Sequence, residues 1–447
     1  MFNKILIANR GEIAVRVIRA CREMNIQTVA VYSEVDRGAL HTQLADEAIC
    51  IGPAPAKDSY LDIKRIISAA IVTGANAIHP GFGFLSENSK FAKVCEECNI
   101  TFIGPTGEMM DKMGNKSRAR ETMVKNNIPV VPGSDGAVKD VEDAIQIAEK
   151  IGYPVIIKAS AGGGGKGMRI ANNKDELLHS FKMASTEAKN AFGDDTMYIE
   201  KYVKNPRHIE FQILADNYGN TIHLGERDCS MQRRHQKVLE ESPSAAINDE
   251  LRKKMGDIAV KAAKSIKYRN AGTVEFLLND SEEFYFIEMN TRIQVEHPVT
   301  EMVTGIDLIK EQIKISNGDK LQYAQEDVKI EGHAIECRIN AENPSKGFRP
   351  CPGTIDFLHI PSGKDIRVDS AIYCGYKIPP TYDSMIAKLI VYDKDRQNAI
   401  KKLNSAIGEF IVKGIETNID FQYDLINNTE FIEGKYNTAF IENLMNK

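Results

Sequence analysis

Hydrophobic and polar positions in the N-terminal part of the chain follow two different periods. Apolar residues fill three short runs that indicate strands: 4–8, 28–32 and 75–79. Between the first two runs, an apolar stripe at helical spacing predicts a helix that opens at Gly11-Glu12. Strands that alternate with helices predict a parallel sheet covered on both faces. The turn before that helix lacks the GxGxxG spacing of a dinucleotide fold, so a nicotinamide site is not expected there.

The elements become shorter in the middle of the chain. A helix with Ser117 as its cap is expected there, and a boundary follows it, marked by turn residues at 129, 132 and 133. The next small segment, to about residue 204, contains three strand-like runs: 154–159, 168–171 and 197–203. The remainder is rich in strands and closes with an amphipathic helix: 207–214, 273–278, 284–288 and, for the helix, 396–409.

Four consecutive glycines lie in KASAGGGGKGM, residues 158–168, between two of these strand-like runs. A Walker A loop requires GxxxxGK[ST] between a strand and a helix, and this loop has neither the hydroxyl residue nor the helix. Glycine N–H groups can still form an anion-binding hairpin that closes over a nucleotide, with Lys158 directed at the same anion. A flexible turn without chemistry is an equally good interpretation of the loop taken alone.

In FYFIEMNTRIQVEHPVTE, residues 284–301, a charged or amide side chain occupies every second position from 288 to 296. Because side chains alternate between the faces of a strand, one face is expected to carry five of them: Glu288, Asn290, Arg292, Gln294 and Glu296. A hairpin loop of four or six residues would place Glu275, from the preceding strand, on the same face as Glu288. Two carboxylates beside Asn290 make an all-oxygen site that suits Mg²⁺ or Mn²⁺.

Three side chains carry candidate chemistry, two of them in this segment and one outside it. Arg292 offers a planar fork for a small planar oxyanion, and Glu296 is placed to act as a general base. Lys237 adds a positive charge nearby in the predicted site. The alternatives are that Glu296 belongs to a surface charge ladder and that Lys237 is a solvated lysine.

Composition narrows the class of protein. With 447 residues, two or three domains are expected, and a net charge of -5 argues against nucleic acid as the main partner. The short basic cluster 233–237 is better explained by a local anion site. No signal peptide and no run of membrane-spanning length is found, and the 8 cysteines are scattered. We therefore expect a cytoplasmic protein with reduced thiols and no membrane partner.

With these residues in view, the chain resembles the biotin carboxylase subunit of biotin-dependent carboxylases, of the acetyl-CoA carboxylase type, in the ATP-grasp superfamily. The resemblance spans nearly the full length and is carried by long motifs: ILIANRGEIAVRVIRACRE, HPGFGFLSEN, GYPVIIKASAGGGGKGM, EKYVKNPRHIE, ERDCSMQRRHQKVLEE, FIEMNTRIQVEHPVTEM, GHAIECRINAE and PPTYDSMIAKLI. It implies an α/β (α+β) ATP-grasp fold with a Rossmann-like parallel-sheet domain, a small mobile lid and a larger antiparallel-sheet domain. The implied segments are an N-terminal domain, a lid, a catalytic domain and a C-terminal domain: 1–113, 114–204, 205–330 and 331–447.

The resemblance also implies roles for individual residues. The implied ATP contacts are Lys116, Lys158, Gly162, Gly163, Gly164, Gly165, Lys166, Gly167, Glu200, Lys201, His208, Gln232, His235 and Leu277. The implied metal ligands are Glu275, Glu288 and Asn290, and bicarbonate would be bound by Lys237, Arg292, Gln294 and the Val295 backbone. Glu296 would be the base, and Arg338 would stabilise the enolate of biotin. The alternative for Arg338 is a strand-surface ion pair.

Four residues bear on partners. Phe82 stands where relatives often carry tyrosine near biotin, so a hydroxyl contact to biotin would be lost. Three residues lie on one helix where the family forms its dimer, although they also fit a solvated helix face: Arg16, Arg19 and Glu23.

The implied reaction uses ATP, bicarbonate and the biotin of a carrier protein to form carboxybiotin, ADP and phosphate. No biotinylation sequence of the AMKM type occurs, so the biotin carboxyl carrier protein and the carboxyltransferase are expected to be separate polypeptides. The parent enzyme is expected to be an acetyl-CoA carboxylase of fatty acid synthesis, with a propionyl-CoA or two-subunit pyruvate carboxylase as the alternative. The rival classes are a different ATP-grasp ligase and a catalytically silent protein that only binds nucleotide.

Overall fold

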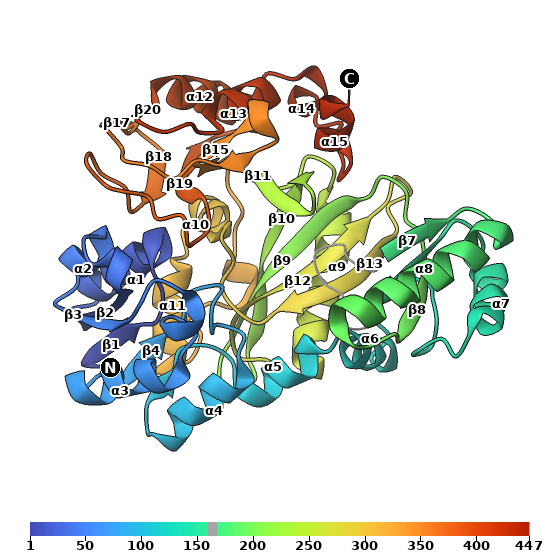
Figure 1. The fold of residues 1–447 in the computed structure, drawn as a ribbon, viewed down its shortest axis with the longest axis horizontal. Coiled ribbons are helices and arrows are strands. Elements are labelled where there is room, and N and C mark those ends of the chain that lie inside the picture. Colours follow the sequence, from blue (N-terminus) through green and yellow to red (C-terminus); the bar gives the residue numbers. More distant parts are fainter. Residues whose placement is uncertain (160–167, 447) are drawn as a thin grey trace.

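A five-stranded parallel sheet forms the N-terminal part of the computed structural model, which describes residues 1–159 and 168–446 apart from the side chains of 117, 191 and 192. The strands run in the order β3-β2-β1-β4-β5, which confirms the predicted parallel sheet (Figure 1). Their bounds are β1 Lys4–Ile7, β2 Gln27–Ser33, β3 Glu47–Gly52, β4 Ala77–His79 and β5 Thr101–Phe102. The helices of this part are α1 Gly11–Glu23, α2 Leu40–Leu44, α3 Ile63–Thr73, α4 Ser89–Glu97 and α5 Gly107–Gly114.

A three-stranded antiparallel sheet follows, at the right of Figure 1. Its strands are β6 Val155–Ala159, β7 Met168–Ala171 and β8 Met197–Lys201, and its helices are α6 Lys116–Lys125, α7 Val141–Ile151 and α8 Lys174–Phe192. Because β6 and β7 pair directly, with Lys158 opposite Met168, the prediction that two strands flank the glycine run is confirmed. The expected cap at Ser117 is wrong: α6 begins one residue earlier, and the Asn115 side chain accepts from Arg118 N–H.

The central sheet has eight strands, all antiparallel to their neighbours, in the order β13-β12-β9-β10-β11-β14-β19-β18. The bounds are β9 Arg207–Ala215, β10 Thr221–Arg233, β11 Gln236–Ser242, β12 Asn270–Leu278, β13 Phe284–Asn290, β14 His333–Asn340, β18 Ile366–Ser370 and β19 Met385–Asp393. The helices around it are α9 Asp249–Ser265, α10 His297–Thr304 and α11 Leu308–Ser316, and smaller pairs are β15 Glu342–Asn343 with β16 Arg349–Pro350 and β17 Phe357–His359 with β20 Ile411–Lys413.

The alternation of side chains along β9 explains how one sheet builds both a core and a site. Ile209, Phe211 and Ile213 are fully buried in the same core cluster as residues of α9, which packs on this sheet. The intervening polar residues of β9 therefore emerge on the opposite face. β12 follows the same rule, with Val274 and Phe276 in the core, so its odd-numbered positions join the polar face.

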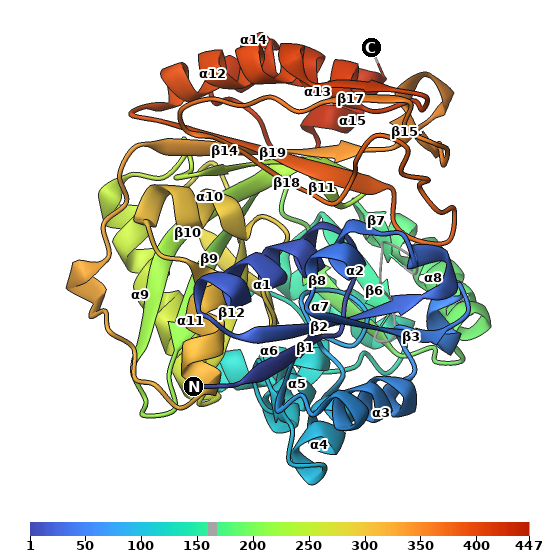
Figure 2. The ribbon, with the colours of Figure 1, turned by 90° about the vertical axis from the view of Figure 1, so that its left-hand side faces the viewer.

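The C-terminal part extends the central sheet rather than forming a separate one. Figure 2 shows the helices of this part lying above β14, β19 and β18. Those helices are α12 Arg396–Glu409, α13 Ile419–Ile426, α14 Thr429–Ile432 and α15 Phe440–Met445. The predicted helix 396–409 matches α12, but the expectation that it is the last one is wrong, because three short helices follow it.

A buried carboxylate joins these C-terminal elements to the sheet. Glu241 on β11 lies 2.7 Å from His333 Nε2 on β14 and 2.7 Å from Arg396 Nε at the start of α12, and it also accepts from the Tyr436 hydroxyl. Burial alone would raise the pKa of Glu241, but these partners outweigh burial and lower it to about 2. Ionised Glu241 therefore ties three elements together.

None of the helices within 1–159 and 168–446 has both the length and the apolar composition needed to cross a membrane.

Candidate active site

A cavity of about 1110 Å³ opens where four parts of the chain meet. Its walls come from the turn after β1, from the lid sheet, from the polar face of the central sheet and from the C-terminal segment. It brings together most of the residues singled out from the sequence: Phe82, Lys116, Lys158, Glu200, Lys201, His208, Gln232, His235, Lys237, Glu275, Leu277, Glu288, Asn290, Arg292, Gln294, Val295 and Arg338. The predicted contacts Gly162–Gly167, with Lys166, lie outside the described residues.

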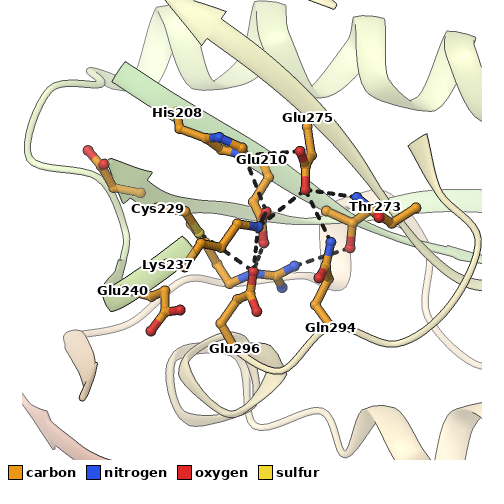
Figure 3. Close-up of polar contacts among 12 residues, drawn as sticks. His208, Glu210, Cys229, Lys237, Glu240, Thr273, Glu275, Gln294 and Glu296 are labelled. Atoms are coloured by element: carbon orange, nitrogen blue, oxygen red, sulfur yellow. Dashed lines mark hydrogen bonds and ion pairs between the residues drawn. The ribbon is translucent and has the colours of Figure 1, made fainter. Parts of the chain in front are cut away.

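Lys237 on β11 lies at the centre of the charged cluster in this cavity (Figure 3). Its Nζ lies 2.5 Å from Glu210 Oε2, 2.6 Å from Glu296 Oε1 and 3.2 Å from Glu275 Oε1. Burial would lower the pKa of Lys237, but the surrounding carboxylates, Glu210 foremost, raise it well above its ordinary value. Lys237 is thus a largely buried cation, with 13% of its side chain exposed, in a ring of three anions, which rules out the solvated-lysine interpretation.

Glu296 lies just behind the cavity wall and is fully buried. Its second oxygen, Oε2, lies 2.9 Å from Arg338 Nη2, so each carboxylate oxygen has its own cation. Burial raises the pKa of Glu296, yet Lys237 and then Arg338 outweigh that effect and hold the pKa well below the ordinary value. Glu296 is therefore an ionised carboxylate in a closed site, and the surface charge ladder is excluded.

Arg338, on β14, connects this carboxylate to a second one. Its Nε lies 2.6 Å from Glu240 Oε1, and only 17% of its side chain is exposed. That burial excludes the surface ion pair that the sequence left open for Arg338. Burial raises the pKa of Glu240 to about 7, because Arg338 offsets only part of the cost of desolvation.

Glu275 and Glu288 lie directly opposite each other in the β12–β13 ladder, as the metal prediction required. The loop between the strands, residues 279–283, has five residues rather than the expected four or six. A register shift between Glu275 and Phe276 absorbs the difference, because one extra residue moves the following side chains to the other face.

The expected strand over 284–296 is wrong beyond Asn290, where β13 ends. Residues 291–296 form turns that lead into α10, and Glu296 occupies the cap position of that helix. The polar residues still converge, because Arg292 donates to the Gln294 side chain (3.0 Å) and to the Asn290 side chain (3.2 Å).

Glu87 of the N-terminal part holds the same segment from the other side. Its Oε2 accepts from Arg292 Nε (2.9 Å) and its Oε1 accepts from Thr291 N–H (3.1 Å). The Arg292 fork is therefore aimed by two parts of the chain that are far apart in the sequence.

The donor set around Glu275 fits a hard cation. Glu275 Oε1 accepts from Asn290 Nδ2 at 2.8 Å and from Gln294 Nε2 at 3.2 Å, and its Oε2 lies 3.2 Å from His208 Nε2. Glu288 is more exposed and lies 3.4 Å from Lys116 Nζ. Two facing carboxylates with an adjacent amide supply the oxygen ligands that Mg²⁺ prefers.

On the lid side of the cavity, charged residues predicted to bind ATP contact one another. Lys158 Nζ lies 2.5 Å from Glu200 Oε2, and Arg120 lies 3.9 Å from the same carboxylate. Lys201 Nζ donates to the carbonyl oxygens of residues 152 and 153 at 2.9 and 3.0 Å. His208 Nδ1 lies 3.0 Å from Gln232 Nε2 on the neighbouring strand.

Sequence reasoning missed several charges of this site, the exposed Glu87 and four buried ones: Glu210, Arg227, Glu240 and Lys388. Arg227 is fully buried, with Nε 2.6 Å from Glu210 Oε1, and it donates further to Gln212, Thr273 and Thr300. The alternation His208, Glu210, Gln212 along β9 was a readable signal. The others are recognisable only once the strand order is known.

Comparison with known families accounts for nearly the whole chain. Residues 1–110 match the biotin carboxylase N-terminal domain, 115–324 match the carbamoyl-phosphate synthase L chain ATP-binding domain, and 336–443 match the biotin carboxylase C-terminal domain.

Similar proteins match over almost their full length. Biotin carboxylase 1 of Bacillus subtilis (strain 168) is 60% identical over 443 residues, which is 99% of this chain and 98% of that protein. One of the pyruvate carboxylase subunits of Methanothermobacter thermautotrophicus is 55% identical over 443 residues, which is 99% of this chain and 90% of that protein.

A solved structure shares the fold as well. The biotin carboxylase domain dimer of the Hydrogenobacter thermophilus 2-oxoglutarate carboxylase, in complex with MgADP, ADP and bicarbonate, superposes with a TM-score of 0.93 at 52% identity, covering 99% of this chain and 98% of its own. Together with the charged cavity, these matches show that the chain belongs to the biotin carboxylase family: it is an ATP-grasp ligase that uses ATP and Mg²⁺ with biotin as its substrate.

Proposed function

We propose that this cavity converts ATP, bicarbonate and the biotin of a carrier protein into carboxybiotin, ADP and phosphate, with Glu296 as the base. The observation that carries the proposal is the position of Glu296, buried between Lys237 and Arg338 at the wall of the cavity. A carboxylate in this position can take a proton from an anion that is bound to Lys237. Once protonated, it no longer pairs with Arg338.

The first step is deprotonation of bicarbonate. Arg292, Lys237, Gln294 and the Val295 N–H bind and orient the anion. Glu296 removes its proton, and a bicarbonate oxygen attacks the γ-phosphorus to give carboxyphosphate and ADP. The lid segment 114–204 closes over the nucleotide and keeps water from this labile product.

The second step carboxylates biotin. Carboxyphosphate breaks down to CO₂ and phosphate, phosphate takes the N1′ proton of biotin, and N1′ then attacks CO₂. Arg338 stabilises the enolate oxygen, and Phe82, which lines the same cavity, packs against biotin. Protonation of Glu296 in the first step weakens its ion pair with Arg338, which frees the guanidinium for the second.

Glu275, Glu288 and Asn290 are the residues that would hold Mg²⁺ or Mn²⁺. When bound, the cation neutralises the charge on the transferring phosphate. The lysines at 116 and 158 border the same region of the cavity and add positive charge around the nucleotide.

The test compares Glu296→Gln with the wild-type enzyme, using bicarbonate-dependent ATP hydrolysis with and without free biotin. Loss of a general base should lower turnover by about 10²- to 10⁴-fold. The dissociation constant for ADP should stay within about threefold, because Glu296 lies on the anion side of the cavity. Glu97→Gln, an exposed carboxylate on α4, is the matched control.

Two outcomes contradict the assignment. Turnover of Glu296→Gln within tenfold of the wild type removes Glu296 as the base. Lost ADP binding shows that the carboxylate serves the nucleotide site instead. An active preparation that biotin fails to stimulate refutes the residue roles as a whole.

The same proposal extends to partners. We place the enzyme in the cytoplasm with a separate biotin carboxyl carrier protein and carboxyltransferase, as part of an acetyl-CoA carboxylase. Pyruvate is the second candidate acceptor, because one relative belongs to a pyruvate carboxylase. Assays of the assembled enzyme with acetyl-CoA and with pyruvate distinguish the two.

A homodimer through α1 completes the proposal. Arg16, Arg19 and Glu23 line a second, shallower hollow of about 390 Å³. Arg16 is already engaged within the chain, at 2.7 Å from Asp307 and 3.0 Å from Glu301. Sedimentation of the wild type and of Arg19→Glu measures whether this face holds two copies together.

A further inference from the structure

Lys388 on β19 is a fully buried lysine that the residue roles above do not use. Its Nζ donates to the Val295 carbonyl oxygen at 2.8 Å and lies 3.3 Å from Glu12 Oε1 and 3.9 Å from Asp369 Oδ2. It is also the register partner of Arg338 on β14. Two cations directly opposite each other on neighbouring strands repel, and the carboxylates of Glu12 and Asp369 beside Lys388 offset that repulsion.

His297 makes a similar contact with the carbonyl group of Gln294, the residue before Val295. This buried histidine opens α10, and its Nδ1 lies 2.8 Å from the Gln294 carbonyl oxygen. Since a carbonyl oxygen can only accept, Nδ1 carries the proton. The other ring nitrogen, Nε2, is buried without a hydrogen-bond partner among the described residues. The contact with Gln294 is thus the hydrogen bond that the ring supplies.

The two contacts hold the peptide units on either side of Val295. In a planar trans peptide, the carbonyl and the following N–H point in opposite directions. When the Gln294 carbonyl is held by His297, the Val295 N–H must point away from that histidine. The Val295 carbonyl, held by Lys388, fixes the next unit in the same way.

The Val295 N–H is free to bind an anion. Val295 lines the cavity, and its N–H donates to no other residue within 1–159 and 168–446. A rotation of the Gln294–Val295 peptide would present a carbonyl oxygen to bicarbonate in place of this N–H, which would repel the anion.

We propose that His297 and Lys388 are positioning residues of the bicarbonate site, which aim the Val295 N–H into the cavity by holding the carbonyl groups of Gln294 and Val295. This inference rests on the proposed contact between Val295 and bicarbonate. It assigns the C-terminal strand β19 and the helix α10 a part in substrate binding, although neither side chain touches the anion.

The principal test is His297→Leu in the full-length enzyme, assayed by ATP hydrolysis with saturating MgATP and free biotin. Loss of one well-aimed donor to an anion should raise the KM for bicarbonate about tenfold. The KM for ATP should stay within about twofold. His297→Asn restores the donor, since its Nδ2 can occupy the place of Nδ1, and should recover most of the bicarbonate affinity.

Two further variants separate positioning from simple loss of stability. Lys388→Met should raise the KM for bicarbonate in the same direction. Met255→Ala, a buried core change on α9, should lower the melting temperature without moving either KM. If Lys388→Met does not fold, His297→Leu decides the matter alone, because the His297 side chain supplies a single hydrogen bond, and the longer one from its backbone N–H to the same carbonyl (3.4 Å) is kept.

The results that would overturn this inference differ from those that would overturn the proposed function. A His297→Leu enzyme with a wild-type KM for bicarbonate overturns the inference, and so does an equal rise in both KM values. If the wild-type enzyme shows no bicarbonate dependence, the proposed function fails instead.

Discussion

Replacing Arg227 with methionine tests whether the site depends on a fully buried cation. Arg227 is fully buried and lies 2.6 Å from Glu210 Oε1. At an effective dielectric constant of about 20, unit charges at that distance attract by about 6 kcal/mol. The measured loss should be smaller, about 3–5 kcal/mol, because the mutant no longer desolvates the guanidinium.

The assay is thermal unfolding, with urea unfolding as a second measure. For a unit of 150–250 residues, a loss of about 4 kcal/mol lowers the melting temperature by roughly 10 °C. The double variant Glu210→Gln/Arg227→Met removes both charges and should recover about half of the loss, since no buried carboxylate is then left without the guanidinium on its Oε1 side. Lys253→Met, which breaks an exposed pair with Asp257, should change stability by about 0.5 kcal/mol or less.

Two results would refute this reasoning. A melting temperature of Arg227→Met within 2 °C of the wild type, on the order of 1 kcal/mol or less, would mean that Lys237, 2.5 Å from Glu210 Oε2, compensates the carboxylate without Arg227. A double variant whose losses simply add would mean that Arg227 and Glu210 do not stabilise each other.

Two further predictions concern pH and bicarbonate. The pKa of Glu241 is lowered from 4.5 to about 2, so its contribution, about 3 kcal/mol, is complete above pH 4.5 and lost as pH falls through 2. Melting curves should show Glu241→Gln below the wild type at pH 7, with a difference that narrows between pH 4.5 and about 2. Glu87→Gln removes a partly exposed partner of Arg292, worth about 1 kcal/mol at most, and should raise the KM for bicarbonate two- to fivefold in steady-state assays.

Each of these has an outcome that contradicts it. A Glu241→Gln deficit that stays constant from pH 7 to 3 would show that the carboxylate is not titrating with a lowered pKa. Equal changes in the KM for ATP and for bicarbonate in Glu87→Gln would show that Glu87 supports the fold rather than Arg292.

The sequence predicted the sheets better than the turns. β7 and α12 lie where the periodicity placed them, and Glu275 faces Glu288 as expected. The prediction of a long strand through residue 296 failed because a polar alternation also arises when turn residues converge on one ligand site. Pro298 in the first turn of α10 was the overlooked signal, since proline favours that position and interrupts a strand.

The missing part of the site consists of charges that pattern reasoning assigns to solvent. Glu210 and Arg227 look like surface residues until the β9–β10 pairing places them against each other in the interior. The contact between Lys388 and Val295 could not be predicted, because the two residues are 93 positions apart in the chain. They meet only because β19 pairs with β14 in the central sheet. The local sequence shows which residues are charged, but it does not show which of them are buried or which partners they contact.

The ladder between β11 and β14 limits how this protein can be recombined. Leu239 pairs with Cys337 and Glu241 with Ile335 along it, so the catalytic and C-terminal segments share one hydrogen-bonded sheet. Without the C-terminal segment, β11 would present an open edge to other chains. In a chimera that joins two relatives near residue 331, β11 and β14 therefore come from different parents. The two parents must agree in the register of this strand pair and in the charges on both strands.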